Sequence, residues 1–353
     1  MRKILRKILP QWMKDIYHRL IGIPDIILTQ TFKSLPFMAS VYYAVLNRKF
    51  GREHKAVLEG KHAYHKTLYK PGKSSILLRR NIHRLEKGLI MEPRRDVFGE
   101  AYIREVVEIY KQALLYGNLQ TDEKKWITDV LVEYFSTVKD TDIIAGARAL
   151  FESCVEEDNL PIKYVPYSYK SMSKTDITYE QLHRLFIQRR SVRWYRDKDV
   201  PMDLIEKAVD IATLAPSACN RQPYSFYISQ GRKNAVEIAK CAGGTGGWAD
   251  GIPCTIVVVG DLSAYYRERD RHLIYIDGSL AAMQLMLAFE TLGLSTCPIN
   301  WPDIEDAEKK LSSLLGLRSF ERAVMLISVG YALESGRIPF SQKKPSSFLI
   351  KKV

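Results

Sequence analysis

Two short polar segments in the second half of the chain contain the residue types that bind a phosphorylated, ring-bearing molecule. Arg189, Arg190, Ser191 and Arg193 place three guanidinium groups and a hydroxyl within five residues. Guanidinium groups present a planar fork of donors that matches phosphate oxygens, and the serine hydroxyl adds a further donor. The second segment, residues 215–223, is a Pro-flanked turn of small and amide residues. Its amides can hydrogen-bond a flat heteroaromatic ring without burying charge.

Each segment alone also has a simpler interpretation. A run of arginines is typical of a solvated basic helix end, and the composition of residues 215–223 is typical of a helix C-terminal turn. Their order along the chain distinguishes these interpretations from a binding site. The pattern predicts a helix over 179–190, a helix over 201–214, the turn, and then a strand over 224–229.

This order resembles the flavin-dependent nitroreductase family. That family opens its domain with a helix ending in R-R-S-x-R, and a second helix ends in A-P-S-x-x-N-x-Q-P before a β-strand. The chain has the second pattern as Ala215-Pro216-Ser217-Ala218-Cys219-Asn220-Arg221-Gln222-Pro223. The similarity extends over about residues 176–353, through Gly246–Asp250, the strand 255–260, the helix around Asp277, Gly293–Ile299, Gly330-Tyr331 and Lys343–Pro345. With its basic N-terminal extension, the chain is similar to nitroreductase-like proteins encoded with surface-polysaccharide enzymes.

The resemblance implies an α+β, nitroreductase-like fold with a central, mostly antiparallel sheet flanked by helices. It also implies FMN at the interface of a homodimer, with NAD(P)H as co-substrate. Hydride would pass through flavin N5 to a small conjugated or aromatic acceptor in a ping-pong cycle, so no catalytic side chain and no metal ligand is expected. Two alternatives stay open. One is a flavin-dependent dehydrogenase, and the other is a flavin-binding interaction module anchored by its N-terminal helix and linked to surface-polysaccharide synthesis.

Two groups of cofactor contacts follow from the resemblance, residue by residue. One group matches the segment that holds the phosphate and ribityl chain and reaches the pyrimidine edge of the ring: Arg189, Arg190, Ser191 and Arg193. The other matches the turn that touches the ring from the partner subunit: Pro216, Ser217, Asn220 and Gln222.

A third group matches the segment that lies over the ring: Pro298, Ile299 and Asn300. Lys343 stands where the family usually has a phosphate-binding arginine. Because lysine provides a point charge rather than a fork, we expect a weaker or water-mediated contact there.

Charge and composition divide the chain. Of its net charge of +13, residues 1–95 account for +15, with 21 Lys/Arg against 6 Asp/Glu. We predict a basic, mainly helical extension over 1–158, a linker over 159–175 and the flavin domain over 176–353. Five cysteines without a CxxC pair indicate a reducing, cytoplasmic compartment rather than a disulfide scaffold.

Residues 1–20 have the pattern of a basic amphipathic helix interrupted by Pro10. Such a helix can lie on an anionic membrane, which predicts peripheral contact with the inner membrane surface, or it can pack on its own chain or a partner. We expect no nucleic-acid binding. Neither this stretch nor the apolar runs that follow it are long enough to span a bilayer.

Local patterns make further predictions about elements. Helices are expected over 101–116, 122–135 and 142–153, and helix 179–190 is expected to turn Leu182, Leu185 and Phe186 inward. A buried helix is predicted over about 274–292, with apolar strands over 256–259, 295–299 and 323–329. His83 and Glu86, three residues apart, could form a metal or proton site or a surface ion pair.

Overall fold

The computed structural model describes residues 27–33, 35–67, 74–117, 119–155, 162–229 and 231–353. The chain forms two compact units, residues 1–56 and 57–353. The amphipathic helix predicted over residues 1–20 lies outside the described residues. In the first unit, α3 (Pro36–Val41) continues into the π-helical turn η1 (Tyr42–Asn47). Helix α4 (Gly51–Thr67) begins in this unit.

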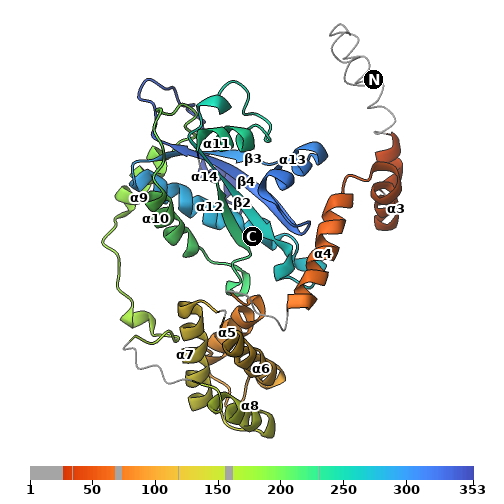
Figure 1. Cartoon of the computed structure of the whole chain (residues 1–353), viewed down its shortest axis with the longest axis vertical. Helices are drawn as coiled ribbons and strands as arrows, with labels where there is room; N and C mark the ends of the chain where they lie inside the picture. Colours follow the sequence, from red (N-terminus) through yellow and green to blue (C-terminus); the bar gives the residue numbers. More distant parts are fainter. Residues whose placement is uncertain (1–26, 34, 68–73, 118, 156–161, 230) are drawn as a thin grey trace. The chain divides into compact units, whose positions relative to one another are not determined.

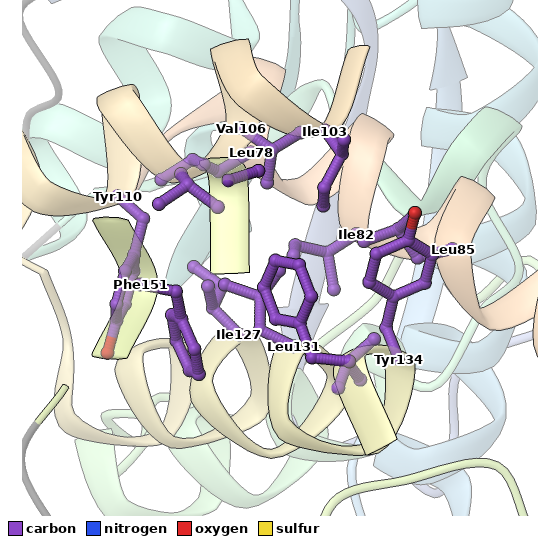
Figure 2. Packing of buried hydrophobic residues seen from close by; sticks show 14 of the residues in the cluster. Leu78, Ile82, Leu85, Ile103, Val106, Tyr110, Ile127, Leu131, Tyr134 and Phe151 are labelled. Carbon is purple, nitrogen blue, oxygen red and sulfur yellow. The ribbon is translucent and has the colours of Figure 1, made fainter. Parts of the chain in front are cut away.

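Four helices with their own hydrophobic core follow in the second unit, and we call α5–α8 the helical bundle. They are α5 (Ile76–Leu89), α6 (Glu100–Tyr116), α7 (Thr121–Thr137) and α8 (Asp142–Glu152), which confirms the three helices predicted here. Figure 2 shows Leu78, Ile82, Leu131 and Tyr134 packed in this core. Each fully buried side chain of this size contributes about 1.5–3 kcal/mol relative to exposure.

Polar side-chain contacts cap α5 and link neighbouring residues within the helical bundle. The Ser75 hydroxyl accepts from the backbone N–H of Leu78 at 3.3 Å and so starts α5. His83 Nδ1 lies 2.9 Å from Glu86 Oε2, which is the ion-pair alternative predicted for this spacing. Among the described residues, no group of three His, Cys, Asp or Glu side chains is placed to hold a metal ion.

An antiparallel four-stranded sheet forms the centre of the C-terminal half (Figure 1). Its spatial order is β1 (Tyr224–Ile228), β2 (Cys254–Asp261), β4 (Glu321–Gly330) and β3 (Ser295–Asn300). All four strands were predicted from the sequence, and the α+β class with an antiparallel sheet is confirmed. In this order β1 and β3 are the two edge strands.

Helices cover both faces of the sheet. On one face α10 (Met202–Thr213) and α12 (Leu273–Thr291) pack on residues such as Ile256 and Ile327. On the other, α11 (Arg232–Ala239) and α13 (Glu305–Leu315) pack on the alternate positions, such as Val257 and Leu326. The strands therefore read as continuous apolar runs, because both of their faces are buried. The short helix α14 (Ser346–Leu349) lies near the C-terminus.

Helix α9 (Tyr179–Gln188) begins with the predicted capping box between Thr178 and Gln181. The prediction that Leu182, Leu185 and Phe186 turn inward is wrong for the single chain, because α9 has no buried residue. Leu182 and Phe186 are exposed, and Leu185 is only half-buried. Its amphipathic pattern correctly shows an apolar side, but within the described part of the chain that side is left largely exposed.

Helix α12 lies against the sheet and is apolar almost all round, as predicted. Together with the residues before it, the stretch Glu268–Thr291 is long and apolar enough to cross a membrane, but half of its most apolar window is buried in the fold. That burial is typical of a core helix. Two of its apolar side chains, Ile276 and Leu280, remain exposed.

Candidate cofactor site

The basic segment 189–193 leaves the end of α9 and runs beside β3. Ser191 pairs with Thr296 as an isolated parallel bridge, and the Val192 N–H donates to the Thr296 carbonyl at 3.0 Å. Buried Tyr195 anchors the segment, since its hydroxyl donates to the Val192 carbonyl at 2.7 Å. The structure thus brings the first predicted group of contacts next to the strand that contains the third.

The three arginines of this segment are half-buried, and none forms an ion pair with a carboxylate of the described chain. Arg190 Nη1 donates to the Arg189 carbonyl at 3.0 Å, and the Arg193 guanidinium lies 5.8 Å from the centre of the Trp248 ring. Half-buried guanidinium groups without an ion-pair partner favour an anionic ligand, because their forks still have unused donors. This charge pattern fits the phosphate of FMN.

Two ionisable groups next to the segment respond to its charge. Burial raises the pKa of the Glu290 carboxyl, and Gln188 and Arg189 oppose that shift only in part. Glu290 Oε1 has no hydrogen-bond partner among the described residues. Burial likewise raises the pKa of the Cys297 thiol, with Arg193 and the Ser191 hydroxyl opposing. The segment therefore lies beside a thiol kept in its neutral form.

The β3 group alternates as a strand requires. Ile299 is buried in the core beside the α11–α13 face, whereas Pro298 and Asn300 are exposed. Only two of these three predicted contacts can thus present a side chain to a ligand; Ile299 can contribute its backbone. Lys343 is on the exposed segment before α14, where its carbonyl accepts from the Gln342 amide at 3.0 Å.

The turn 216–222 has an unusual backbone. Cys219, Asn220 and Gln222 have φ of 53°, 50° and 48°, in the left-handed region that residues other than glycine seldom enter. That region costs roughly 1–2 kcal/mol per residue, and such strain persists only where neighbouring groups fix the backbone.

Several hydrogen bonds within the C-terminal half hold this turn. The Ala218 N–H donates to Asp277 Oδ2 at 3.0 Å, and the Gln222 N–H donates to the Ser217 hydroxyl at 3.0 Å. Gln222 Nε2 also donates to the Thr213 carbonyl at 2.8 Å. Pro216 is exposed, and Ser217 is half-buried. The predicted turn residues therefore lie together, on a backbone prepared by its surroundings.

The turn and the basic segment do not lie at the same edge of the sheet. The turn leads into β1, whereas the basic segment runs along β3, and these are opposite edge strands. Three strand spacings of about 4.8 Å place the edge strands β1 and β3 about 14 Å apart. One chain therefore presents two separate groups of predicted contacts.

Three residues that bear on these groups were assigned no site role from the sequence. Asp277 and Glu290 are buried carboxylates on the otherwise apolar α12, and their isolation in such a helix is a signal that could have identified them. Arg79 gave no signal, because it contacts Asn220 across 141 residues of sequence.

Comparison with known proteins agrees with this architecture. A model of the nitroreductase family matches residues 187–244 and 229–331. A protein of Methanothermobacter thermautotrophicus, provisionally named NADH dehydrogenase/NAD(P)H nitroreductase, is 30% identical over 150 residues, which cover 42% of this chain and 75% of the relative. The chain belongs to the nitroreductase family.

Another relative and a solved structure have lower sequence identity. Iodotyrosine deiodinase 1 of Pongo abelii is 24% identical over 225 residues, covering 55% of this chain and 75% of the relative. A solved structure titled FMN-dependent nitroreductase, from Clostridium difficile R20291, is 25% identical with a TM-score of 0.39, covering 44% of this chain and 91% of that one. The family match begins within α9, so the helical bundle lies outside it.

Proposed function

We propose that this nitroreductase-family protein is an FMN-dependent oxidoreductase that uses NAD(P)H to reduce a small conjugated or aromatic acceptor. The observation that supports this most is the basic segment. Its three half-buried guanidinium groups lie beside β3 and have no carboxylate partner in an ion pair within the described chain. A phosphate monoester is the ligand whose charge and shape use such forks best.

In this proposal the chain binds and orients the cofactor. Arg189, Arg190, Ser191 and Arg193 hold the phosphate and ribityl chain, with Lys343 as a further cation. When bound, FMN would supply hydride transfer at N5. Pro298 and Asn300, the exposed residues of β3, would lie against the ring, and backbone N–H groups of the non-proline residues of this strand would provide donors to it.

We further propose that the second group of contacts comes from another copy of the chain. The turn with Pro216, Ser217, Asn220 and Gln222 lies at the opposite edge of the sheet, so a symmetric homodimer can bring one subunit's turn to the other subunit's basic segment. Each dimer would then hold two equivalent sites.

Exposed apolar side chains support a dimer. On α9 they include Phe186, which is 43% exposed, and just after α10 they include Leu214, which is 73% exposed. Ile276 and Leu280 on α12 are exposed as well, in a helix that is otherwise buried. Large apolar surfaces of this kind mark an interaction site, because they remain in contact with water in the isolated chain.

The acceptor class follows from the chemistry of the family. The names of the relatives refer to nitro compounds and to iodotyrosine, and both kinds of molecule have an electron-poor or aromatic group that can stack on a flat cofactor. A stacked acceptor needs no charged catalytic side chain, because the cofactor supplies the chemistry.

The visible spectrum of the purified full-length protein tests the proposal. We expect a yellow protein with flavin absorption that is lost anaerobically on adding NADH or NADPH and recovered on adding a nitroarene or quinone. A protein that stays colourless after incubation with FMN would refute the cofactor assignment. Bound flavin that neither nicotinamide reduces would favour the binding module or the dehydrogenase instead.

A further inference from the structure

Helix α5 of the helical bundle reaches the strained turn through one side chain, Arg79. Its Nε donates to the Asn220 carbonyl at 3.0 Å, and its Nη2 donates to Gln222 Oε1 at 3.1 Å. Asn220 and Gln222 are two of the three residues of this turn with left-handed φ. One planar guanidinium therefore contacts two of the strained residues at once.

The other side of the same guanidinium is fixed inside the bundle. Arg79 Nη1 donates to Glu123 Oε2 at 3.0 Å, and the two side chains are only 15% and 7% exposed. Glu123 also accepts from the Ser75 N–H at 3.0 Å and from the Ser74 hydroxyl at 2.7 Å. The guanidinium lies 5.3 Å from the Trp126 ring centre. Its position is thus set by α7 and by the start of α5.

We infer that Arg79 is a positioning residue for the candidate cofactor turn, and that the helical bundle is thereby a working part of the site. Arginine suits this task because its fork is rigid and it donates to three acceptors at once. The Gln222 amide is held from both sides, since its Nε2 donates to Thr213 and its Oε1 accepts from Arg79. The buried ion pair with Glu123 keeps the fork from rotating away.

The effect on FMN rests on the proposed function, but the effect on the turn does not. Without Arg79, the Asn220 carbonyl and the Gln222 amide each lose a charge-assisted hydrogen bond. The left-handed backbone then relaxes more easily, because strain of this kind persists only while its surroundings fix it. The turn would present Asn220 and Gln222 to the ring less often in the correct geometry.

Four full-length proteins test this inference: the wild type, Arg79→Lys, the double variant Arg79→Gln/Glu123→Gln, and the control Arg84→Gln. Arg79→Lys keeps the charge beside Glu123 and removes the fork. The double variant removes the whole ion pair, so that no buried charge is left alone. Arg84 is on the same helix, but it contacts Asn81 and the Tyr102 ring within the bundle.

The first measurement is amide hydrogen exchange of the flavin-free proteins. Exchange in residues 217–222 should be about tenfold faster in both Arg79 variants, which corresponds to the loss of a charge-assisted hydrogen bond. It should be unchanged in Arg84→Gln, and exchange in α7 shows whether the bundle is still folded. If the turn of a folded Arg79→Lys protein exchanges its amide hydrogens at the same rate as the wild type, the inference is overturned.

The second measurement is FMN affinity by flavin fluorescence. We expect the Kd to rise about tenfold in both Arg79 variants and to stay constant in Arg84→Gln, with a shifted flavin absorption maximum. A wild type that binds no FMN would refute the proposed function and leave the exchange result to decide on Arg79. Faster exchange in the turn with unchanged FMN affinity would overturn the assignment of Arg79 to the site.

Discussion

Arg193 is the side chain on which we expect FMN retention to depend most directly. It is half-buried beside Trp248 and forms no ion pair with a described carboxylate. Arg193→Ala should weaken FMN binding by about 1–3 kcal/mol, the range of a charge-assisted hydrogen bond. Fluorescence titration of the flavin-free protein measures this loss.

Arg196→Ala is the matched control for Arg193, because Arg196 is exposed and pairs with Glu334 on the surface. It should bind FMN like the wild type. Equal retention in Arg193→Ala and Arg196→Ala would mean that the phosphate does not bind at the basic segment.

Glu290 provides a prediction on pH. Burial raises its pKa in the folded chain above the ordinary value of 4.5. The folded state therefore favours the protonated carboxyl, so the wild type loses stability as the pH rises from 4.5 through the folded pKa. In Glu290→Gln this loss is absent, and the Tm of the variant minus that of the wild type should increase with pH. Thermal melts of the flavin-free proteins from pH 4.5 to 8 measure it; a constant difference would contradict the prediction.

Residue types alone predicted the basic segment and the turn, but not the residues that fix them. Short-range patterns reveal Arg189–Arg193 because the arginines are adjacent in sequence. They cannot reveal that Arg79 donates to Asn220, because that contact depends on how two separate hydrophobic cores pack. Nor does composition predict φ of 53° at Cys219, which is set by tertiary hydrogen bonds.

At the scale of elements, periodicity identified helices and strands well but not what covers them. The strands β2 and β4 were predicted because both of their faces are apolar, and α9 because of its capping box and apolar side. The apolar side of α9 was expected in the chain's own core and is exposed instead. A hydrophobic pattern shows that a face needs a cover, but not whether the cover belongs to the same chain.

If a second copy covers α9, a charge on its apolar side should dissociate the dimer. Phe186→Glu should yield a monomer by light scattering, since burying a carboxylate in an apolar interface costs several kcal/mol. The control Arg184→Glu adds negative charge on the polar, exposed side of the same helix and should remain dimeric. A dimeric Phe186→Glu protein would exclude α9 from the interface.

At the scale of the whole molecule, the basic N-terminal quarter predicts peripheral attachment to an anionic membrane. Residues 1–20 have six Lys/Arg and one Asp. Each cation near an anionic surface contributes about 1 kcal/mol, enough together with apolar burial for reversible binding. The full chain should float with anionic but not neutral vesicles, and high salt should release it.

Deletion of residues 1–20 is the comparison for that experiment. The shortened chain should stay in the soluble fraction with both kinds of vesicle while keeping its flavin spectrum. Equal recovery of the full chain in the soluble fraction under all conditions would rule out membrane attachment by this segment.

The two groups of predicted contacts lie at opposite edges of one sheet, so in the proposed dimer each site takes one group from each subunit. Two variants that are each defective in a different group should therefore complement one another. A chain with Arg193→Ala has an intact turn, and a chain with a damaged turn, such as Asn220→Ala, has an intact basic segment. Co-expressed, two such chains, each with weakened FMN binding, would form mixed dimers in which one site combines both intact halves and the other combines both defects. With random pairing, about a quarter of the wild-type number of sites should be recovered. Two defects within the same half, Arg189→Ala and Arg193→Ala, should give no recovery when paired in this way.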